Sequence, residues 1–303
     1  MKLSLRIDQV TNLRQILGFL LLIRKNCILK FQIDQINIIS IDQDNLTSTP
    51  IIWCTINKKI FKKYEVIAKD NLIGIELNIE PLFQILKNFE KSMSTTDLSI
   101  KLTRSDNTNN NSTTTTNTTN NKRNVYLALQ FNNSITMNNE ITHSFSIPVD
   151  LLRISSLDKI RIPILKNIHL IIDMNRTLIP LFKRIERYKA TEFINIVINK
   201  LGELKIKMHD DGKNISLKWK NLLDTCKPED VDTQINNRDE TDLDMINDIN
   251  IKIRIKWWNF VSRLLEICDI LPFYIIDNGC AFHCNVEDEQ NCSIDYYIPG
   301  KII

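Results

Sequence analysis

The sequence is poor in the residues on which most enzyme sites depend. Its 303 residues include only six glycines and four histidines. The glycines form neither the G-x-G-x-x-G nor the G-x-x-x-x-G-K-[ST] pattern that cradles a phosphate. No serine or cysteine has a nucleophile-like setting, so nucleotide binding and covalent catalysis lack support. We therefore expect a protein that is not an enzyme and that uses no cofactor.

The chain also lacks a long apolar run and a signal for secretion. Its longest apolar run, Ile16 to Ile23, falls far short of the roughly 20 residues that a membrane-spanning helix needs. Seven cysteines make an odd count with no evident pairing frame, and no basic, apolar and small pattern opens the chain. We expect an intracellular protein with free thiols and no membrane contact.

The best candidate for a metal site is excluded by strand geometry. Cys280, His283, Cys284 and Cys292 resemble a zinc set in their spacing. Because side chains alternate along a strand, Cys280 and Cys284 should face one side and His283 the other. The paired acids at 42 and 44, at 210 and 211, and at 287–289 fit turn composition. The sequence therefore predicts buried thiols and no metal.

The distribution of charge along the chain says more about the protein than its net charge of +3. The first 150 residues hold 17 basic and 13 acidic side chains. In the second half, the segment Asp224 to Asp248 contains nine acids against Lys227 and Arg238 and conceals an otherwise basic body. Another biased segment, rich in Asn and Thr, runs from Ser105 to Lys122. We expect both segments to be loops inserted between elements of a basic fold.

With those segments set aside, one pattern occurs four times: a strand, an amphipathic helix and three further strands. The copies begin at Lys2, Leu72, Asn167 and Ile249. The first helix follows Asp8, and the others are predicted at 81–91, 179–188 and 256–268. One such unit has little core of its own, so the units should pack in pairs. The predicted class is α+β, with an N-terminal domain at 1–147, a connector at 148–163 and a C-terminal domain at 164–303.

Short motifs in the same order along the chain carry a family resemblance. They are the opening MKLSLRI, the Trp53-Cys54 pair, KRIERY from Lys183, FHCNV from Phe282 and DYYIPGKI from Asp295. With the repeat, they resemble the Hus-one/Mec-three subunit of the heterotrimeric DNA-damage checkpoint clamp, a relative of the sliding clamp proliferating cell nuclear antigen. The two biased segments depart from the family pattern, so no interaction of theirs is carried over.

The resemblance implies a fold, partners and a location. The fold would be that of a DNA clamp, in which the helices line a central hole. The chain would form a ring with two other clamp-like subunits, be loaded by a clamp loader with an alternative large subunit, and encircle duplex DNA without sequence specificity. It would promote checkpoint kinase activation and DNA repair in the nucleus.

Each predicted helix has a polar face that carries cations. The third helix is the most basic, and the fourth is the weakest because it also carries Glu266. The predicted DNA-facing residues are Arg14, Lys25, Lys87, Lys91, Lys183, Arg184, Arg187, Lys256 and Arg263. On a single helix, a solvated surface explains such charges better than DNA contact does, and only their recurrence on four helices, together with the resemblance, favours DNA contact. The tryptophans at 257 and 258 cannot both point into one core.

By analogy with clamps, two strands and the connector would meet partners. The predicted subunit-interface residues are Ile141, His143, Phe145 and Ile147 on one strand and Ile215, Leu217 and Trp219 on another. The predicted docking residues of the connector are Leu151, Leu152, Ile154, Leu157 and Ile160, although covering a domain junction would explain them equally well. Two alternatives stay open: a homotrimeric replication-type clamp, and an intracellular protein-binding scaffold without DNA contact.

Overall fold

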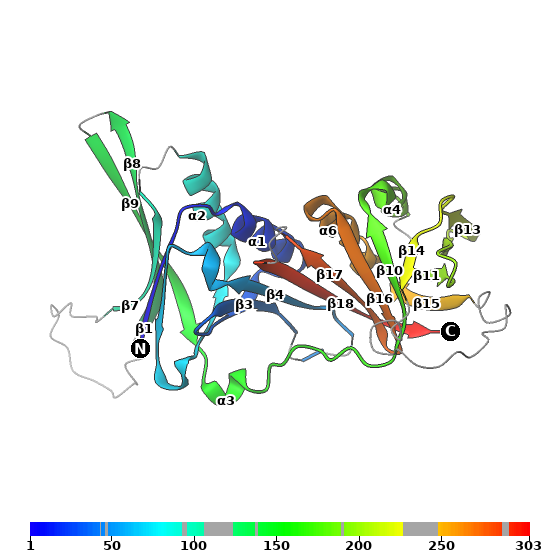
Figure 1. Ribbon diagram of the computed structural model, residues 1–303, viewed down its shortest axis with the longest axis horizontal. Coiled ribbons are helices and arrows are strands. Elements are labelled where there is room, and N and C mark those ends of the chain that lie inside the picture. Colours follow the sequence, from blue (N-terminus) through cyan, green and yellow to red (C-terminus); the bar gives the residue numbers. More distant parts are fainter. Residues whose placement is uncertain are drawn as a thin grey trace, which may run out of the picture. The chain divides into compact units, whose positions relative to one another are not determined.

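The chain folds into two compact units in a computed structural model (Figure 1). The structure describes residues 1–42, 44–45, 48–92, 96–105, 124–136, 139–188, 191–226, 248–286 and 291–303. The first unit comprises Met1–Ile39 and Thr55–Arg161, and the second comprises Ser40–Cys54 and Ile162–Ile303. Among the described residues, no helix has both the length and the apolar character required to cross a membrane.

The first unit contains two of the predicted repeats. Its elements are β1 (Lys2–Ile7), α1 (Thr11–Ile23), β2 (Asn26–Phe31), β3 (Gln35–Ser40), β4 (Ile51–Asn57), β5 (Lys63–Ile67), β6 (Ile73–Asn78), α2 (Ile79–Lys91), β7 (Leu98–Ser105), β8 (Asn124–Thr136), β9 (Asn139–Leu151) and α3 (Ile154–Leu157). The following strand pairings are all antiparallel: β1 lies between β5 and β7, β8 between β7 and β9, and β2 between β3 and β6. The last residues of β9 also pair with β6.

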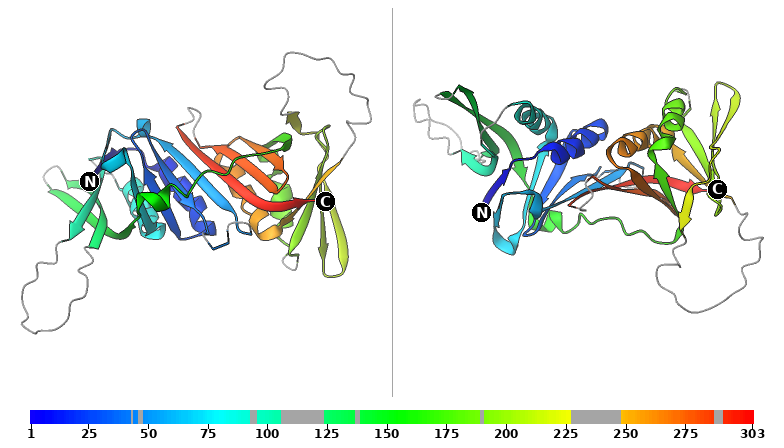
Figure 2. Two further views of the ribbon diagram at one scale, coloured as in Figure 1. Left: turned by 90° about the horizontal axis from the view of Figure 1, so that it is seen from below. Right: turned by 45° about the horizontal axis from the view of Figure 1, so that its top comes forward.

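The helices α1 and α2 lie side by side (Figures 1 and 2). Asn78 caps α2, because its side chain accepts a hydrogen bond from the backbone N–H of Glu80. Ile16, Leu17 and Leu20 of α1 are fully buried, as is Leu86 of α2. The apolar stripe of each helix therefore packs into the core, as its spacing predicts.

The second unit contains the other two repeats. Its elements are β10 (Ile168–Asn175), α4 (Ile179–Ile185), β11 (Phe193–Ile198), β12 (Leu204–Asp210), β13 (Lys213–Lys218), β14 (Asp224–Cys226), β15 (Ile249–Arg254), α5 (Ile255–Trp258), α6 (Val261–Ile267), β16 (Ile270–Ile276), β17 (Gly279–Asn285) and β18 (Cys292–Ile302). One set of antiparallel strands runs β14-β10-β16-β17-β18, and the other runs β13-β12-β11-β15-β18. β18 belongs to both.

Trp258 is the centre of the second unit's core. Its fully buried indole meets the rings of Phe182, Phe273 and Phe282 edge-on, with centroids 5.2 to 5.8 Å apart. The buried Tyr296 hydroxyl donates a hydrogen bond of 2.8 Å to the backbone carbonyl of Trp257. This aromatic cluster joins α4 and α5 to the sheet behind them.

Several boundaries differ from the prediction. The strands β5 and β14 and the short helix α3 were not predicted, and β14 turns the first residues of the acidic segment into a strand that pairs with β10. Residues 227–247 of that segment and most of the Asn/Thr-rich one lie outside the described residues. The segment Ser40–Cys54, predicted in the first domain, belongs to the second unit, so the boundary divides β4: its residues up to Cys54 belong to the second unit and those from Thr55 to the first. In the second unit, β4 pairs with β18.

The fourth helix is broken where an unbroken one was predicted. Phe260 donates its backbone N–H to the carbonyl of Trp257, three residues back, and the Ser262 hydroxyl donates to the carbonyl of Asn259. A serine hydroxyl that donates to a backbone carbonyl competes with the helical N–H donor that would otherwise bond to the same carbonyl. Two short helices, α5 and α6, replace the single predicted one.

Replacing Gly202 by Ala should destabilise the second unit by at least about 2 kcal/mol. Gly202 has a φ of +83°, and an added Cβ would collide with the backbone carbonyl of Leu223. Gly212 has a similar φ of +74° but nothing within 4 Å of an added Cβ, so Gly212→Ala should cost only about 1 kcal/mol of conformational strain. Urea unfolding of both variants measures the difference, and equal losses of stability would contradict the predicted collision.

The His283–Asp295 pair predicts a pH-dependent part of the stability. Nδ1 of His283 lies 2.6 Å from Oδ1 of Asp295, and this hydrogen bond raises the pKa of His283 above its usual value. A raised folded-state pKa stabilises the fold fully below the unfolded pKa of His, and the stabilisation is lost as pH rises through the folded value. Asp295→Asn should therefore destabilise the protein more at pH 6 than at pH 9 in urea titrations. A destabilisation that is independent of pH would show that the pair is not charged.

Candidate nucleic-acid and subunit interfaces

The predicted cations of the first unit are partly neutralised by carboxylates of the same unit. Nε of Arg14 on α1 lies 2.6 Å from Oε2 of Glu90 on α2, and Nζ of Lys25 lies 2.8 Å from Glu80. Lys87 is half-buried and Lys91 is exposed, and neither has a carboxylate within 4 Å among the described residues. The positive charge available on this helix pair therefore comes mainly from α2.

The packing of α1 also limits what it can present to a ligand. Gly18 of this helix lies against the ring of Phe83, which would stand 3.3 Å from an added Cβ. Leu22 on the same helix is 48% exposed. The outer surface of α1 is thus largely uncharged.

The second unit presents a more basic helix surface. Lys183, Arg184 and Arg187 are all exposed on α4 and the turn that follows it. Within the described part of the unit, Arg184 and Arg187 have no carboxylate within ion-pairing distance. Glu186, next to them, is turned inward and accepts a hydrogen bond of 2.8 Å from the Ser262 hydroxyl. Two guanidinium groups therefore face solvent without a counter-charge from the described residues.

Glu266 of α6 accepts ion pairs from two of the predicted DNA-facing cations. Its carboxylate lies 2.9 Å from Nζ of Lys183 and 3.0 Å from Nη1 of Arg263. Burial raises the pKa of Glu266, but the hydrogen bonds from Lys183 and Arg263 outweigh it and hold the pKa below its usual value. One carboxylate shared by two cations leaves a net positive charge at this point.

The tryptophan pair at the start of the fourth helix divides as the spacing predicts. Trp258 is fully buried, whereas Trp257 is half-buried with Nζ of Lys256 at 4.0 Å from its ring centroid.

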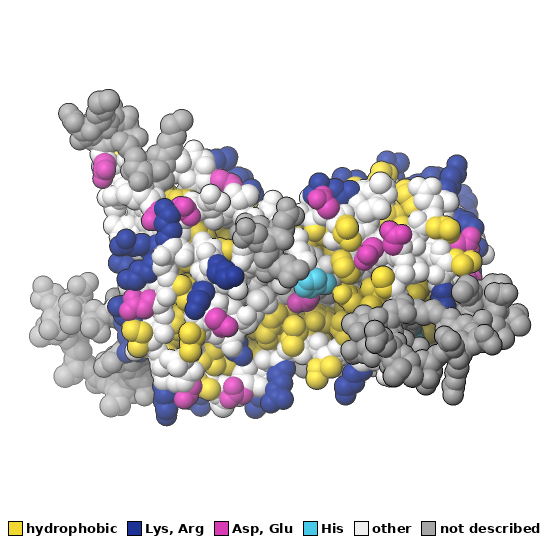
Figure 3. All heavy atoms as spheres, viewed as in Figure 1, with side chains coloured by type: hydrophobic (Ala, Val, Ile, Leu, Met, Phe, Trp, Pro, Cys, Tyr) yellow, Lys and Arg dark blue, Asp and Glu magenta, His cyan; other side chains and the backbone are white. Residues whose placement is uncertain are grey.

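In the space-filling view, Lys and Arg side chains are visible over the helices of both units (Figure 3). All nine predicted cations therefore lie on or beside helices, in two groups of unequal strength.

The strand β9 has an open edge along most of its length. It pairs with β8 from Asn139 to Val149, and only its last two residues pair on the other side, with β6, in the described part of the chain. Ile141 is 44% exposed, and His143 and Phe145 stack on Phe131 with centroids 4.8 and 6.1 Å away. Ile147, predicted for an interface, is 3% exposed and belongs to the core.

The strand β13 has a second open edge. Among the described residues it pairs with β12 alone. Ile215 and Leu217 are half-buried, and Trp219 follows the strand, with its backbone N–H donating to the carbonyl of Leu204 at 2.9 Å. Both strands predicted to meet neighbouring subunits thus have backbone groups available for pairing.

The connector residues divide into exposed and buried ones. Leu151 is 39% exposed, and Leu152 and Ile154 are half-buried. Leu157 and Ile160 are 1% and 8% exposed, and Leu157 packs directly over Gly74 of β6. Their prediction as docking residues is corrected, because a side chain already in the core of the first unit has no surface left for a partner.

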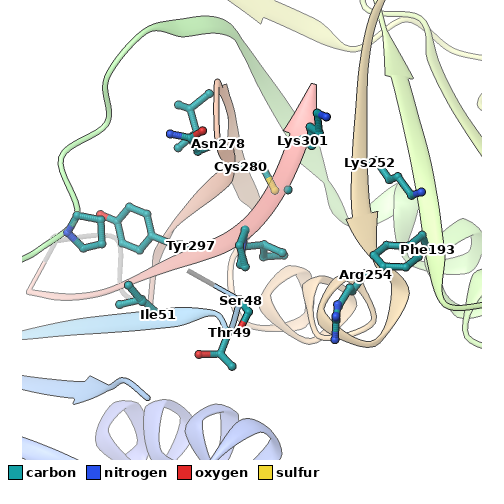
Figure 4. A pocket seen from close by; sticks show the side chains of 15 residues that line it. Ser48, Thr49, Ile51, Phe193, Lys252, Arg254, Asn278, Cys280, Tyr297 and Lys301 are labelled. Carbon is teal, nitrogen blue, oxygen red and sulfur yellow. The ribbon is translucent and has the colours of Figure 1, made fainter. Parts of the chain in front are cut away.

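A pocket of about 740 Å³ in the second unit was not predicted from the sequence (Figure 4). Ile51, Tyr297 and Pro299 contribute apolar surface, and Lys252 and Arg254 come from β15. No carboxylate lines it among the described residues. The terminal DYYIPGKI motif contains the tyrosine, the proline and Lys301 of this pocket, whereas Lys252 and Arg254 come from β15, which is distant in sequence.

The cysteines follow the predicted alternation. Cys280, Cys284 and Cys292 are buried thiols, while His283 points to the other side of β17, toward Asp295. Within the ranges that the structure describes, no group of three or more His, Cys, Asp or Glu side chains is placed to hold a metal ion. The acidic turn at 287–290 lies outside those ranges.

Comparison with known proteins places the chain in a family. Residues 1–302 match the family model described as Hus1-like protein. The DNA damage checkpoint control protein MEC3 of Saccharomyces cerevisiae is 26% identical, in an alignment that covers 70% of this chain and 57% of that protein. The chain thus spans about 57% of the length of this curated relative.

Solved structures show the same fold. The proliferating cellular nuclear antigen of Entamoeba histolytica aligns with a TM-score of 0.65 and 12% identity over 99% of this chain and 98% of that one. The PCNA2-PCNA3 complex of Sulfolobus tokodaii aligns with a TM-score of 0.62 and 13% identity over 98% of each chain. The predicted α+β clamp fold and the predicted family are confirmed, and the chain belongs to the family of Hus1-like proteins.

Proposed function

We propose that this chain is a non-catalytic subunit of a heterotrimeric DNA-damage checkpoint sliding clamp. The match to Hus1-like proteins and the PCNA-like fold support it, as does the similarity to the yeast DNA damage checkpoint control protein MEC3. The observation that carries the proposal is the exposed Arg184 and Arg187 beside α4, which have no carboxylate partner in the described part of the unit. In this role the chain acts in the nucleus and promotes checkpoint kinase activation and repair.

The helix cations would hold duplex DNA by its phosphates. Such contacts position DNA without reading its sequence, which suits a ring that must slide. Enclosure replaces contact energy in preventing escape, so a modest net charge is sufficient. Because Glu80 and Glu90 neutralise much of the first helix pair and Glu266 pairs with Arg263 of α6, we infer that α4 and the turn after it make the stronger contact.

The open edges of β9 and β13 would join two different clamp-like neighbours. An edge strand adds a neighbour's strand through backbone hydrogen bonds, and side chains next to the edge select the partner. Ile141 and the stacked pair His143 and Phe145 give the β9 edge an aromatic character. Ile215 and Leu217 give the β13 edge an aliphatic one.

The exposed part of the connector would meet the clamp loader with its alternative large subunit. Leu151, Leu152 and Ile154 keep apolar surface there. A small apolar patch of this kind suits a transient partner, because a permanent interface needs a larger buried area.

Charge reversal beside α4 should weaken DNA binding without affecting assembly. In the ring formed with both partners, Lys183→Glu, Arg184→Glu and Arg187→Glu together should lower the slope of log K against log salt by about 3, because each phosphate that a cation neutralises accounts for roughly 0.9 of that slope. Fluorescence anisotropy on duplex DNA measures the slope. The matched control reverses Lys58, Lys59 and Lys69, exposed residues of the first unit outside its helix pair.

The same variants test topological binding. Retention on circular gapped DNA should require the loader and ATP, disappear when the DNA is linearised, and fall for the helix variant alone. Retention that survives linearisation would exclude an encircling ring. Failure of the helix variant to assemble would show that this surface is a subunit interface.

Oligomeric mass separates the proposal from its alternatives. The chain alone should not trimerise. Coexpression with both partners should give a single complex that contains one copy of each of the three subunits. Ile141→Glu should weaken that complex at least tenfold while changing fold stability by less than about 0.5 kcal/mol, because Ile141 is 44% exposed. Thr142→Glu, on the opposite face of β9, is the control. A self-trimer would favour a replication-type clamp, and no complex at all would favour a protein-binding scaffold.

A further inference from the structure

The sheet formed by β13, β12, β11, β15 and β18 has a polar face opposite its core face. Ile194, Ile196, Ile206 and Ile253 point inward and are at most 1% exposed. Side chains alternate along a strand, so their neighbours in sequence point to the other side. We call this other side the outer lysine face; it includes Lys205, Lys207, Phe193, Asn195, Lys252, Arg254 and Lys301, with Val197, Asn250 and His209 on the same side.

Strand register places three lysines in one row across this face. Lys207 of β12 is opposite Asn195 of β11, Asn195 is opposite Lys252 of β15, and Lys252 is opposite Lys301 of β18. At about 4.8 Å between strands, the row spans roughly 14 Å. All three lysines are exposed, and none has a carboxylate within ion-pairing distance in the described part of the unit. An unneutralised row of this kind attracts a chain of regularly spaced anions.

An aromatic ring lies beside the row. Phe193 is half-buried, with Nζ of Lys252 at 4.7 Å and the guanidinium carbon of Arg254 at 5.6 Å from its centroid. Hollows of about 740 and 520 Å³ share Phe193 and Lys252 as lining residues, so they adjoin one another. In Figure 4 these two residues and Arg254 lie on neighbouring strands at one side of the larger hollow.

Charge in the two hollows is one-sided. Their cations are Lys207, Lys252, Arg254 and Lys301, and their single described carboxylate is Glu192, which lies 4.0 Å from Arg254. Among the residues that the structure describes, the lysines of the row therefore have no internal competitor for an anionic ligand.

We propose that the outer lysine face binds single-stranded DNA. Lys207, Lys252 and Lys301 bind successive phosphates, and one base stacks on Phe193. A basic track combined with an aromatic platform is how proteins hold single strands without sequence preference. The inference rests on the proposed function for the source of the strand, since a gapped duplex carries single-stranded DNA next to the duplex that the helices would hold.

Other polyanions fit this face less well. Bases within a duplex are stacked on each other, so they leave Phe193 without a partner. An acidic peptide needs apolar pockets for its alternate side chains, and the larger hollow offers apolar surface from Ile51, Tyr297 and Pro299 at one end of the row. Along the row itself, the outward side chains of β11, β12 and β15 are mostly polar or charged, so a peptide gains no such pocket there. A single strand uses both features, because its phosphates bind the lysine row and one of its bases stacks on the aromatic ring of Phe193.

Anisotropy with a fluorescent 20-nucleotide oligo-dT and the purified full-length chain tests the inference. Lys207→Glu, Lys252→Glu and Lys301→Glu together should weaken binding at least tenfold at low salt. They should also reduce the slope of log K against log salt by about 2, roughly 0.7 for each phosphate. Reversal of Lys58, Lys59 and Lys69, exposed lysines of the first unit, should leave both unchanged.

The aromatic platform has its own test. Phe193→Ala should weaken oligo-dT binding about fivefold or more, and Phe193→Tyr should restore it, because either ring can stack on a base. Thermal unfolding identifies any general loss of fold in the Ala variant.

Three results would overturn the proposal: binding unchanged by the lysine variant, equal weakening with the control variant, or tighter binding of an acidic 20-residue peptide than of oligo-dT. Because the assay uses neither loader nor partners, its outcome is separable from the clamp proposal. Loss of oligo-dT binding with normal loading on circular DNA would remove this inference alone. Normal oligo-dT binding with no ring would remove the clamp proposal alone.

Discussion

Burial of one face of each antiparallel sheet is the constraint on which the other features of both units depend. Isoleucine and leucine at every second strand position fill that face, and the apolar stripes of the helices complete it. The second unit closes around Trp258, whose contacts with three phenylalanines join helices to strands. Once the apolar positions are assigned inward, the remaining side chains form two kinds of surface, one on the helices and one on the outward sheet faces.

Carboxylates decide how much of each basic surface is available to a ligand. Arg14 and Lys25 face glutamates of their own unit, whereas Arg184 and Arg187 do not in the described structure, and Glu186 between them is turned inward by Ser262. Exposed ion pairs contribute little to stability, about 0 to 1 kcal/mol. Their larger effect is on the electrostatic field that a phosphate meets, and this effect makes the two helix pairs unequal.

The repeat was predictable because its strands and helices differ clearly in apolar period, and the order strand, helix and three strands is found in all four copies. Residues that depend on competition between neighbours were less predictable. Ser262 interrupts the fourth helix by taking the carbonyl of Asn259. Leu157 is an apolar connector residue of the kind expected at a docking surface, but it packs over Gly74. No local pattern shows that Gly74, which is distant in sequence, leaves space for the Leu157 side chain.

By itself, the sequence determined the α+β class, the fourfold repeat, the buried cysteines and the helices that carry cations, because each follows from periodicity or local composition. The tertiary structure decided which cations remain unpaired within the described residues, which connector residues are buried, and which lysines share a row. Those properties depend on strand register and on side chains from distant segments. Lys207, Lys252 and Lys301 are adjacent only because β12, β11, β15 and β18 pair in one register, a long-range contact that no local pattern encodes.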